Sequence, residues 1–221
     1  MKDLAAAFQR DVRLFHAFPP AATRELARRS SVRRYGKGER LCHAGEPARS
    51  VWALLSGRVC VQRRHWNGRN LGIEIMVPGD VIGLPALTHW SYPSELQATL
   101  GSEAAVIPRS VLLELMDQEP LVARSLFSAI TQRLRFAERQ LFLAQEPVET
   151  RLVAALLYLS EKFGSRLPLT HEEIGQMAAT TAETTMRKLK SLAELGLIRR
   201  RRGEVVIVDR VKLAGLLPEG A

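Results

Sequence analysis

The interval between apolar positions changes along the chain, and each change marks a different kind of element. Residues 3–16 carry apolar side chains three and four positions apart, which predicts an amphipathic helix, and residues 21–29 predict a second short helix. From about residue 31 to 107, short apolar or alternating segments lie between closely spaced glycines, which predicts short strands of a sandwich or barrel. Asn67-Gly68 signals a hairpin, because a type I′ turn needs positive φ at both central positions.

The helical period returns after Pro108. Residues 109–117 predict a short helix, 119–145 one long helix, and 148–163 another helix beyond a break at Pro147. The apolar positions of the long helix step by four, four, four, three and four, which predicts a narrow seam that pairs two copies of the helix. Packing on the chain's own barrel is the alternative. The seam residues are Val122, Leu126, Ile130, Leu134, Ala137 and Leu141.

Two further helices and a hairpin are predicted in the last quarter of the chain. Thr170 and Glu173 form a capping box, which starts a helix over 171–178. After a tight turn a second helix runs over about 182–195, and residues 197–208 predict a β-hairpin. This order of helix, turn, helix and hairpin is a winged helix-turn-helix. The apolar residues of the second helix are expected to pack inward: Met186, Leu189, Leu192, Ala193 and Leu195.

Charge and cysteine content narrow the function classes. Lys and Arg number 32 against 23 Asp and Glu, a net charge of +9, which favours nucleic acid or an anionic membrane surface as partner. No apolar run approaches the roughly 18 residues of a membrane span, and no signal-peptide core is present, so we expect a cytoplasmic protein without a membrane partner. Cys42 and Cys60 are too few for a disulfide scaffold or a zinc site of three or four thiolates, and no metal site is predicted.

The second helix of the helix-turn-helix carries candidate base-reading residues. Glu183 and Arg187 lie four positions apart, so they project on one side near the start of the helix, where a recognition helix meets base edges. Arginine can bond guanine O6 and N7, and glutamate can accept from cytosine N4. An exposed ion pair is the alternative. Four consecutive arginines in the hairpin, Arg199, Arg200, Arg201 and Arg202, fit contacts to a phosphate backbone, and a solvated turn is their alternative.

The whole arrangement resembles the Crp/Fnr superfamily of bacterial transcription regulators. The resemblance covers nearly all of the chain and is strongest in HAGEPARSVWALLSGRVCV, VPGDVIG and LTHEEIGQMAATTAETTMRKLKSLAELGLI. It implies an α+β fold: a jelly-roll barrel like a cyclic-nucleotide-binding domain over 1–118, a dimerisation helix over 119–146, and a winged helix-turn-helix over 147–221, with the helix-turn-helix at about 170–195.

The resemblance also assigns residues to DNA. It implies base reading by Glu183 and Arg187, whereas Ala182 replaces an arginine common in cyclic-AMP-type members, so one guanine contact is expected to be absent. His171 stands where a phosphate-contacting arginine is common, so that contact is expected to be weaker or pH-dependent. The backbone-contacting set is Thr170, His171, Thr181, Thr184, Lys188, Arg199, Arg200, Arg201 and Arg202.

The sensory half departs further from cyclic-nucleotide-binding relatives. Leu84 replaces the glutamate that holds the ribose, and no arginine lies between Arg69 and Arg109 to clamp a phosphate. The expected pocket is therefore apolar and unsuited to cyclic AMP, and no cofactor is predicted. No cysteine precedes Cys42, which excludes the iron–sulfur branch. The pocket set is Gly83, Leu84, Tyr92, Ser94, Phe136 and Ala137.

These observations favour a DNA-binding transcription regulator that recognises an inverted repeat as a homodimer, with RNA polymerase as a partner implied by the resemblance. A stand-alone sensory module acting through protein contacts is the second hypothesis. An enzyme is the third, and the chain contains no GxSxG, P-loop or HExxH motif. The effector, the target promoters and the choice between activation and repression stay open.

Overall fold

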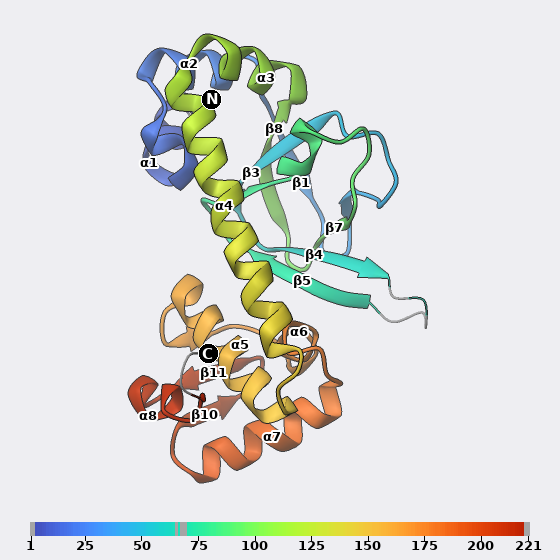
Figure 1. Cartoon of the computed structure of the whole chain (residues 1–221), viewed down its shortest axis with the longest axis vertical. Helices are drawn as coiled ribbons and strands as arrows, with labels where there is room; N and C mark the ends of the chain where they lie inside the picture. Colours follow the sequence, from blue (N-terminus) through green and yellow to red (C-terminus); the bar gives the residue numbers. More distant parts are fainter. Residues whose placement is uncertain (1–2, 65, 67–69, 219–221) are drawn as a thin grey trace. The chain divides into compact units, whose positions relative to one another are not determined.

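A computed structural model describes residues 3–64, 66 and 70–218 (Figure 1). The turn predicted at Asn67-Gly68 lies outside the described residues. The chain divides into two compact units: one comprises the chain up to Arg63 together with Glu74–Leu134, and the other comprises Arg64–Ile73 together with the chain from Arg135 onward. Each unit is described by itself.

The first unit begins with two α-helices and a 3₁₀ helix. Asp3 caps α1 (Leu4–Asp11) by accepting from the amides of Ala5 and Ala6 at 3.1 and 3.2 Å. The single helix predicted over 3–16 is wrong, because buried Val12 adopts an extended conformation and separates α1 from η1 (Arg13–Ala17). The helix predicted over 21–29 is α2 (Pro20–Arg28).

Two antiparallel four-stranded sheets form the body of the first unit. One has the order β1-β8-β3-β6 and the other β2-β7-β4-β5. They form the predicted jelly-roll-like domain, with the strands in two separate sheets rather than in one closed barrel. Their bounds are β1 (Ser31–Tyr35), β2 (Arg40–Cys42), β3 (Ser50–Ser56), β4 (Val59–Arg64), β5 (Asn70–Met76), β6 (Val81–Ile82), β7 (Glu95–Ala98) and β8 (Ser102–Pro108), with η2 (Leu84–Leu87) after β6.

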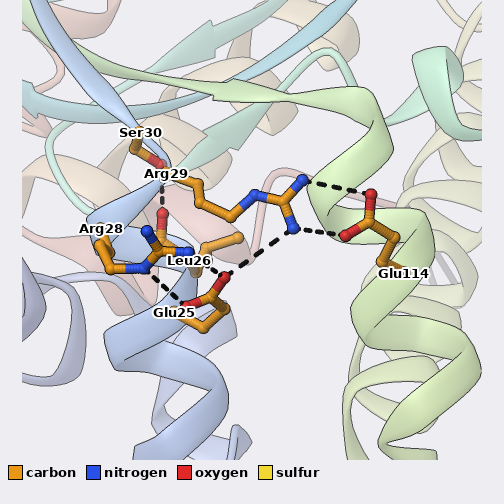
Figure 2. Close-up of polar contacts among 6 residues, drawn as sticks. All are labelled: Glu25, Leu26, Arg28, Arg29, Ser30 and Glu114. Carbon is orange, nitrogen blue, oxygen red and sulfur yellow. Dashed lines mark hydrogen bonds and ion pairs between the residues drawn. The ribbon is translucent and has the colours of Figure 1, made fainter.

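Helix α3 (Arg109–Gln118) follows β8 and is tied to α2 by charge. Arg29 lies between Glu25 and Glu114, as Figure 2 shows, and its Nη2 donates to Glu114 Oε1 at 3.2 Å while its other terminal nitrogen also contacts that carboxylate. Arg28 pairs with Glu25 at 2.7 Å. Burial of Val111, Leu112 and Leu115 on α3 fixes the helix against the same core as the sheets.

Helix α4 (Pro120–Leu143) is the long helix predicted over 119–145. Its first two turns belong to the core of the first unit: Val122 is 0% exposed and Leu126 1% exposed. Val122 and Leu126 therefore cannot contact a second copy, and their assignment to the dimer seam was wrong. The alternative of packing on the chain's own sensory domain holds for these two residues.

The second unit contains the predicted helix-turn-helix and hairpin. The hairpin strands pair antiparallel, with Arg200 opposite Val205, and β9 adds a third strand beside β11. The capping box is confirmed: Thr170 Oγ1 accepts from the Glu173 amide at 3.2 Å, and Glu173 Oε2 accepts from the Thr170 amide at 2.8 Å. The elements are α5 (Val148–Phe163), β9 (Arg166–Leu167), α6 (His171–Met177), α7 (Ala182–Glu194), β10 (Ile198–Arg201), β11 (Glu204–Ile207) and α8 (Arg210–Ala214).

Packing between α6 and α7 depends on a glycine and a threonine. A Cβ at Gly175 would lie 2.6 Å from Thr185 Oγ1, so the two helices approach closely only because Gly175 has no side chain. Thr185 is fully buried, and with Leu189 and Leu192 it forms the inward face of α7. Met186 and Leu195 were predicted to pack inward, but both are exposed, because the face that turns inward is centred on Thr185. In the described part of the chain, no helix is both long and apolar enough to cross a membrane.

Candidate nucleic-acid interface

The first turns of α7 present two unpaired charged side chains. Thr181 caps the helix by accepting from the Thr184 amide at 3.2 Å, which fixes where α7 begins. Glu183 and Arg187 follow on the exposed side. Neither forms a hydrogen bond or an ion pair with any residue that the structure describes, so the intrahelical ion pair, which was the alternative, is not formed. Both are free to bind a ligand.

The threonines predicted to contact DNA differ in whether their hydroxyl proton is still free to donate a hydrogen bond. Thr170 Oγ1 donates to Glu173 Oε2 at 2.9 Å, and Thr181 Oγ1 donates to Thr184 Oγ1 at 3.1 Å. Both hydroxyl protons are thus already donated to neighbouring side chains. Thr184 accepts in its pair, so its own proton stays available to donate to a phosphate oxygen.

The hairpin carries the four predicted arginines on β10 and in the turn that follows it. Arg199, Arg200, Arg201 and Arg202 are all exposed. Within the described residues, no carboxylate lies within ion-pair distance of them. Four adjacent cations without an anionic partner repel one another, and a phosphate backbone relieves this repulsion.

His171 begins α6, and the positive charge of Arg200 affects its pKa. Partial burial lowers the pKa of His171 below its ordinary value of 6.5, and the Arg200 guanidinium lowers it further. The imidazole is therefore neutral at pH 7, where it can donate a hydrogen bond from one nitrogen but adds no charge. The structure thus brings together two members of the predicted backbone-contacting set that lie 29 positions apart in the sequence.

Lys188 has a partner that the sequence analysis did not anticipate. Its Nζ lies 2.6 Å from Glu149 Oε2 on α5, and both side chains are partly exposed. Its charge is thus balanced within the unit, unlike that of Arg187. Contact between Lys188 and DNA stays a prediction.

An exposed apolar stripe runs along α4, next to the buried residues Val122 and Leu126. Phe127, which the sequence analysis left out of the seam, is 72% exposed, and Leu134 is 58% exposed. A groove of about 640 Å³ lies beside the first half of the stripe, lined by residues of η2, α3 and α4 that include Phe127, Ile130 and Arg124. The stripe consists of Phe127, Ile130, Leu134, Ala137 and Leu141, whose steps of three and four match a heptad repeat.

Part of the predicted effector pocket is filled by a tryptophan. Gly83 begins η2 with a left-handed φ of 87°, and a Cβ there would lie 3.0 Å from the Trp52 ring. The ring centroids of Trp52 and Tyr92 are 5.4 Å apart, and the Tyr92 hydroxyl donates to the Ser50 carbonyl at 2.7 Å. Leu84 is buried and Ser94 is half-buried. Gly83 and Tyr92 thus both lie against the Trp52 ring.

The predicted helix-side pocket residues, Phe136 and Ala137, belong to the second unit. The Phe136 ring stacks on Tyr158 of α5 with centroids 4.4 Å apart, inside the second unit. Its place in an effector pocket stays a prediction. Ala137 is exposed on α4. Arg133 donates to the Val81 carbonyl at 3.1 Å and lies 3.5 Å from the Glu74 carboxylate, so its charge is already balanced.

Both cysteines are buried free thiols. Burial raises the pKa of Cys42 to about 12, which keeps this thiol protonated and unreactive at neutral pH. Cys42 is thus a poor candidate for redox chemistry.

Sequence reasoning missed Glu149, Trp52 and Phe127. Glu149 begins α5, 39 positions from Lys188, so no local spacing connects them. Trp52 lies in a predicted strand, but the strand pattern does not show which side chain fills a pocket. Phe127 had a usable signal: three residues before Ile130, it continues a heptad as well as Leu126 does.

Models of two protein families match this chain. The cyclic nucleotide-binding domain matches residues 32–119, and the Crp-like helix-turn-helix domain matches residues 150–216. The second match contains Glu183, Arg187 and all four hairpin arginines.

Individual proteins match over most of the chain. The Cyclic AMP receptor protein of Thermus thermophilus is 30% identical over 210 residues, covering 93% of this chain and 95% of that protein. The Transcriptional activator protein anr of Pseudomonas aeruginosa is 28% identical, covering 81% of this chain and 78% of the relative. The structure of FixK2 from Bradyrhizobium japonicum superposes with a TM-score of 0.81 at 25% identity, covering 87% of this chain and 99% of FixK2.

Proposed function

Because this chain belongs to the Crp/Fnr family of transcription regulators, and carries the helix-turn-helix domain of that family, we propose that it binds an inverted-repeat operator as a homodimer. Glu183 and Arg187 read base edges in the major groove, while the hairpin arginines contact phosphates beside it. RNA polymerase is the further partner that this family implies, and a regulator of chromosomal DNA works in the cytoplasm.

One observation carries the proposal. The exposed start of α7 holds a carboxylate and a guanidinium four positions apart, and neither is neutralised by another described residue. A protein-binding surface would be depleted of such charges at its centre, which disfavours the stand-alone sensory module that acts through protein contacts. A double helix offers both partners: guanine acceptors for Arg187 and a cytosine donor for Glu183.

The homodimer is supported by the exposed stripe of α4. Large apolar side chains such as Phe127 and Leu134 are mostly exposed, and their heptad spacing suits a parallel pair of helices. A two-fold axis along α4 gives each protomer the same contact and sets the two recognition helices on matching half-sites.

Cyclic AMP is not the effector in this proposal. A buried cyclic nucleotide needs a cation and donors at its phosphate, since burial of an unpaired charge costs several kcal/mol. The neighbourhood of Gly83 offers Leu84, Trp52 and Tyr92 instead, and the Tyr92 hydroxyl is bonded to Ser50. The regulator is then active without an effector or takes a small, largely apolar one.

Selection of bound duplexes from a random pool tests the proposal. We expect an inverted repeat with half-site centres about one helical turn apart and a G·C pair in each half-site. Arg187→Ala should weaken binding by about 1–3 kcal/mol and relax the preference at one position. Arg200→Ala should weaken binding to all sequences alike and flatten the salt dependence. Identical behaviour of both variants on cognate and scrambled duplexes would contradict these roles.

A further inference from the structure

The outward face of α7 carries an apolar side chain between the two charged residues assigned to base reading. Met186 is 46% exposed, although methionine in this helix was expected to pack inward. The inward position is taken by its neighbour Thr185, which is fully buried and whose Oγ1 donates to the Thr181 carbonyl at 2.8 Å. The contact of Thr185 with Gly175 fixes this rotation of α7, so Met186 has to point outward.

The neighbours of Met186 on that face follow from helix geometry. In an α-helix, positions three and four apart share a face, so Met186 lies beside Ala182 and Glu183, and Arg187 is next to it in the chain. Ala182 is exposed too. A single exposed apolar side chain needs no explanation by itself. This one is placed where the helix would enter the major groove.

We propose that Met186, together with the Ala182 methyl group, recognises the C5-methyl group of a thymine next to the G·C pair that Arg187 reads. Thymine is the base that presents an apolar group in the major groove, and apolar side chains are its usual partners. The thioether is flexible and polarizable, so it can follow the position of the methyl group. The inference rests on the proposed function, since it needs α7 in the major groove, and it adds an apolar determinant to the two charged ones.

Replacement of thymine by uracil tests the inference directly, because uracil lacks only the C5-methyl group. Each thymine of the selected operator is replaced in turn, in both half-sites, and the dissociation constant is measured by fluorescence anisotropy. Burial of one methyl group corresponds to about a fourfold change in affinity. We expect one position at which wild-type protein loses about fourfold per half-site, adjacent to the G·C pair.

Variants connect that position to Met186. Met186→Ala should lose most of the difference between thymine and uracil duplexes at this position, while Met186→Leu, which keeps a large apolar side chain, should retain most of it. Ser191→Ala, an exposed change further along α7, serves as the control and should keep the full difference. Loss of no affinity at any uracil, or an unchanged loss in Met186→Ala, overturns the inference while the regulator function stands. If no duplex is selected at all, the proposed function fails, and the inference fails with it.

Discussion

Lys188 of the recognition helix and Glu149 of α5 form an ion pair with 2.6 Å between Nζ and Oε2. The pair ties α7 to α5 and neutralises a cation that the family resemblance assigns to the DNA backbone. Glu149 also places a negative charge near a surface proposed to meet phosphates.

We expect Glu149→Gln to strengthen binding to all duplexes by roughly three- to fivefold, because it frees Lys188 for a phosphate contact. The slope of log affinity against log salt should steepen by about 1. Glu161→Gln is the matched control: Glu161 lies on α5 like Glu149 but pairs with Arg210 of α8, so its replacement should leave the slope unchanged. A salt titration by anisotropy measures both. An unchanged slope in Glu149→Gln would show that Lys188 only positions α7.

The apolar stripe of α4 gives the second prediction. Ile130→Glu should produce monomers and abolish tight operator binding, because the two-fold axis places the new charge in the interface twice. Gln132→Glu adds the same charge outside the stripe and should leave the dimer intact. Light scattering separates the two states. Val122→Glu should instead unfold the first unit, since Val122 is fully buried in its core. A dimeric Ile130→Glu protein would contradict the interface.

The contrast between Val122 and Phe127 shows where sequence reasoning stops. Val122 and Leu126 are four positions apart and Phe127 and Ile130 three, and both steps are helical, yet the first two side chains are buried and the second two are exposed. Which of them meets the core depends on how α4 packs with the sheets, whose strands β1 and β3 lie far from α4 in the sequence. Periodicity predicts that a helix has apolar positions, but not which partner covers each of them.

The capping box, by contrast, was predicted correctly from the local sequence. The capping box of Thr170 and Glu173 involves residues three positions apart, so its geometry is contained in the segment itself, and the helix begins where that box predicts. The pairs Lys188–Glu149 and Gly175–Thr185 are different, because they form only after α5, α6 and α7 pack. The inward position of Thr185, and hence the exposure of Met186, could not be predicted without that packing.

Cyclic AMP provides the third prediction. Calorimetry should detect no binding at micromolar concentration, because Leu84 and the Trp52–Tyr92 pair offer the phosphate no cation. Thermal unfolding is an independent measurement, because a ligand at a hundred times its dissociation constant would raise the free energy of unfolding by about 2.7 kcal/mol. We therefore expect no rise in Tm at about 1 mM cyclic AMP, which is a hundred times a 10 μM dissociation constant. A dissociation constant below about 10 μM would contradict this expectation.

His171 predicts a pH dependence with a defined sign. Its pKa is lowered in the free protein by burial and by Arg200, whereas a phosphate beside it would raise the pKa. DNA binding should therefore take up a proton, and affinity should rise as pH falls from about 7.5 to 5.5. His171→Gln should remove most of this dependence. An equal pH dependence in wild type and His171→Gln would assign the proton to another group.

The same shift affects stability in the opposite direction. Because the folded pKa of His171 lies below the unfolded value, the unfolded chain binds the proton first. The contribution of His171 to the free energy of unfolding is fully present above a pH of about 6.5 and decreases as pH falls below it. His171→Gln should be less sensitive to acid than wild type in urea unfolding of the free protein.

The turn between α6 and α7 contains a residue with unfavourable backbone geometry. Ala179 has a φ of 49°, in the left-handed region, where a Cβ costs about 1–2 kcal/mol. Ala179→Gly removes this strain, and the greater freedom of glycine in the unfolded chain offsets part of the gain. We expect the free energy of unfolding of the second unit to rise by about 0.5–1 kcal/mol, with an unchanged m-value in urea.

Ala178→Gly is the control: Ala178 has an ordinary φ of −92° and is buried, so the substitution should destabilise by about 1 kcal/mol. Because the Ala179 side chain is exposed and bonds to nothing, DNA affinity should stay unchanged in Ala179→Gly. Destabilisation by Ala179→Gly would mean that the left-handed geometry carries no strain in this turn.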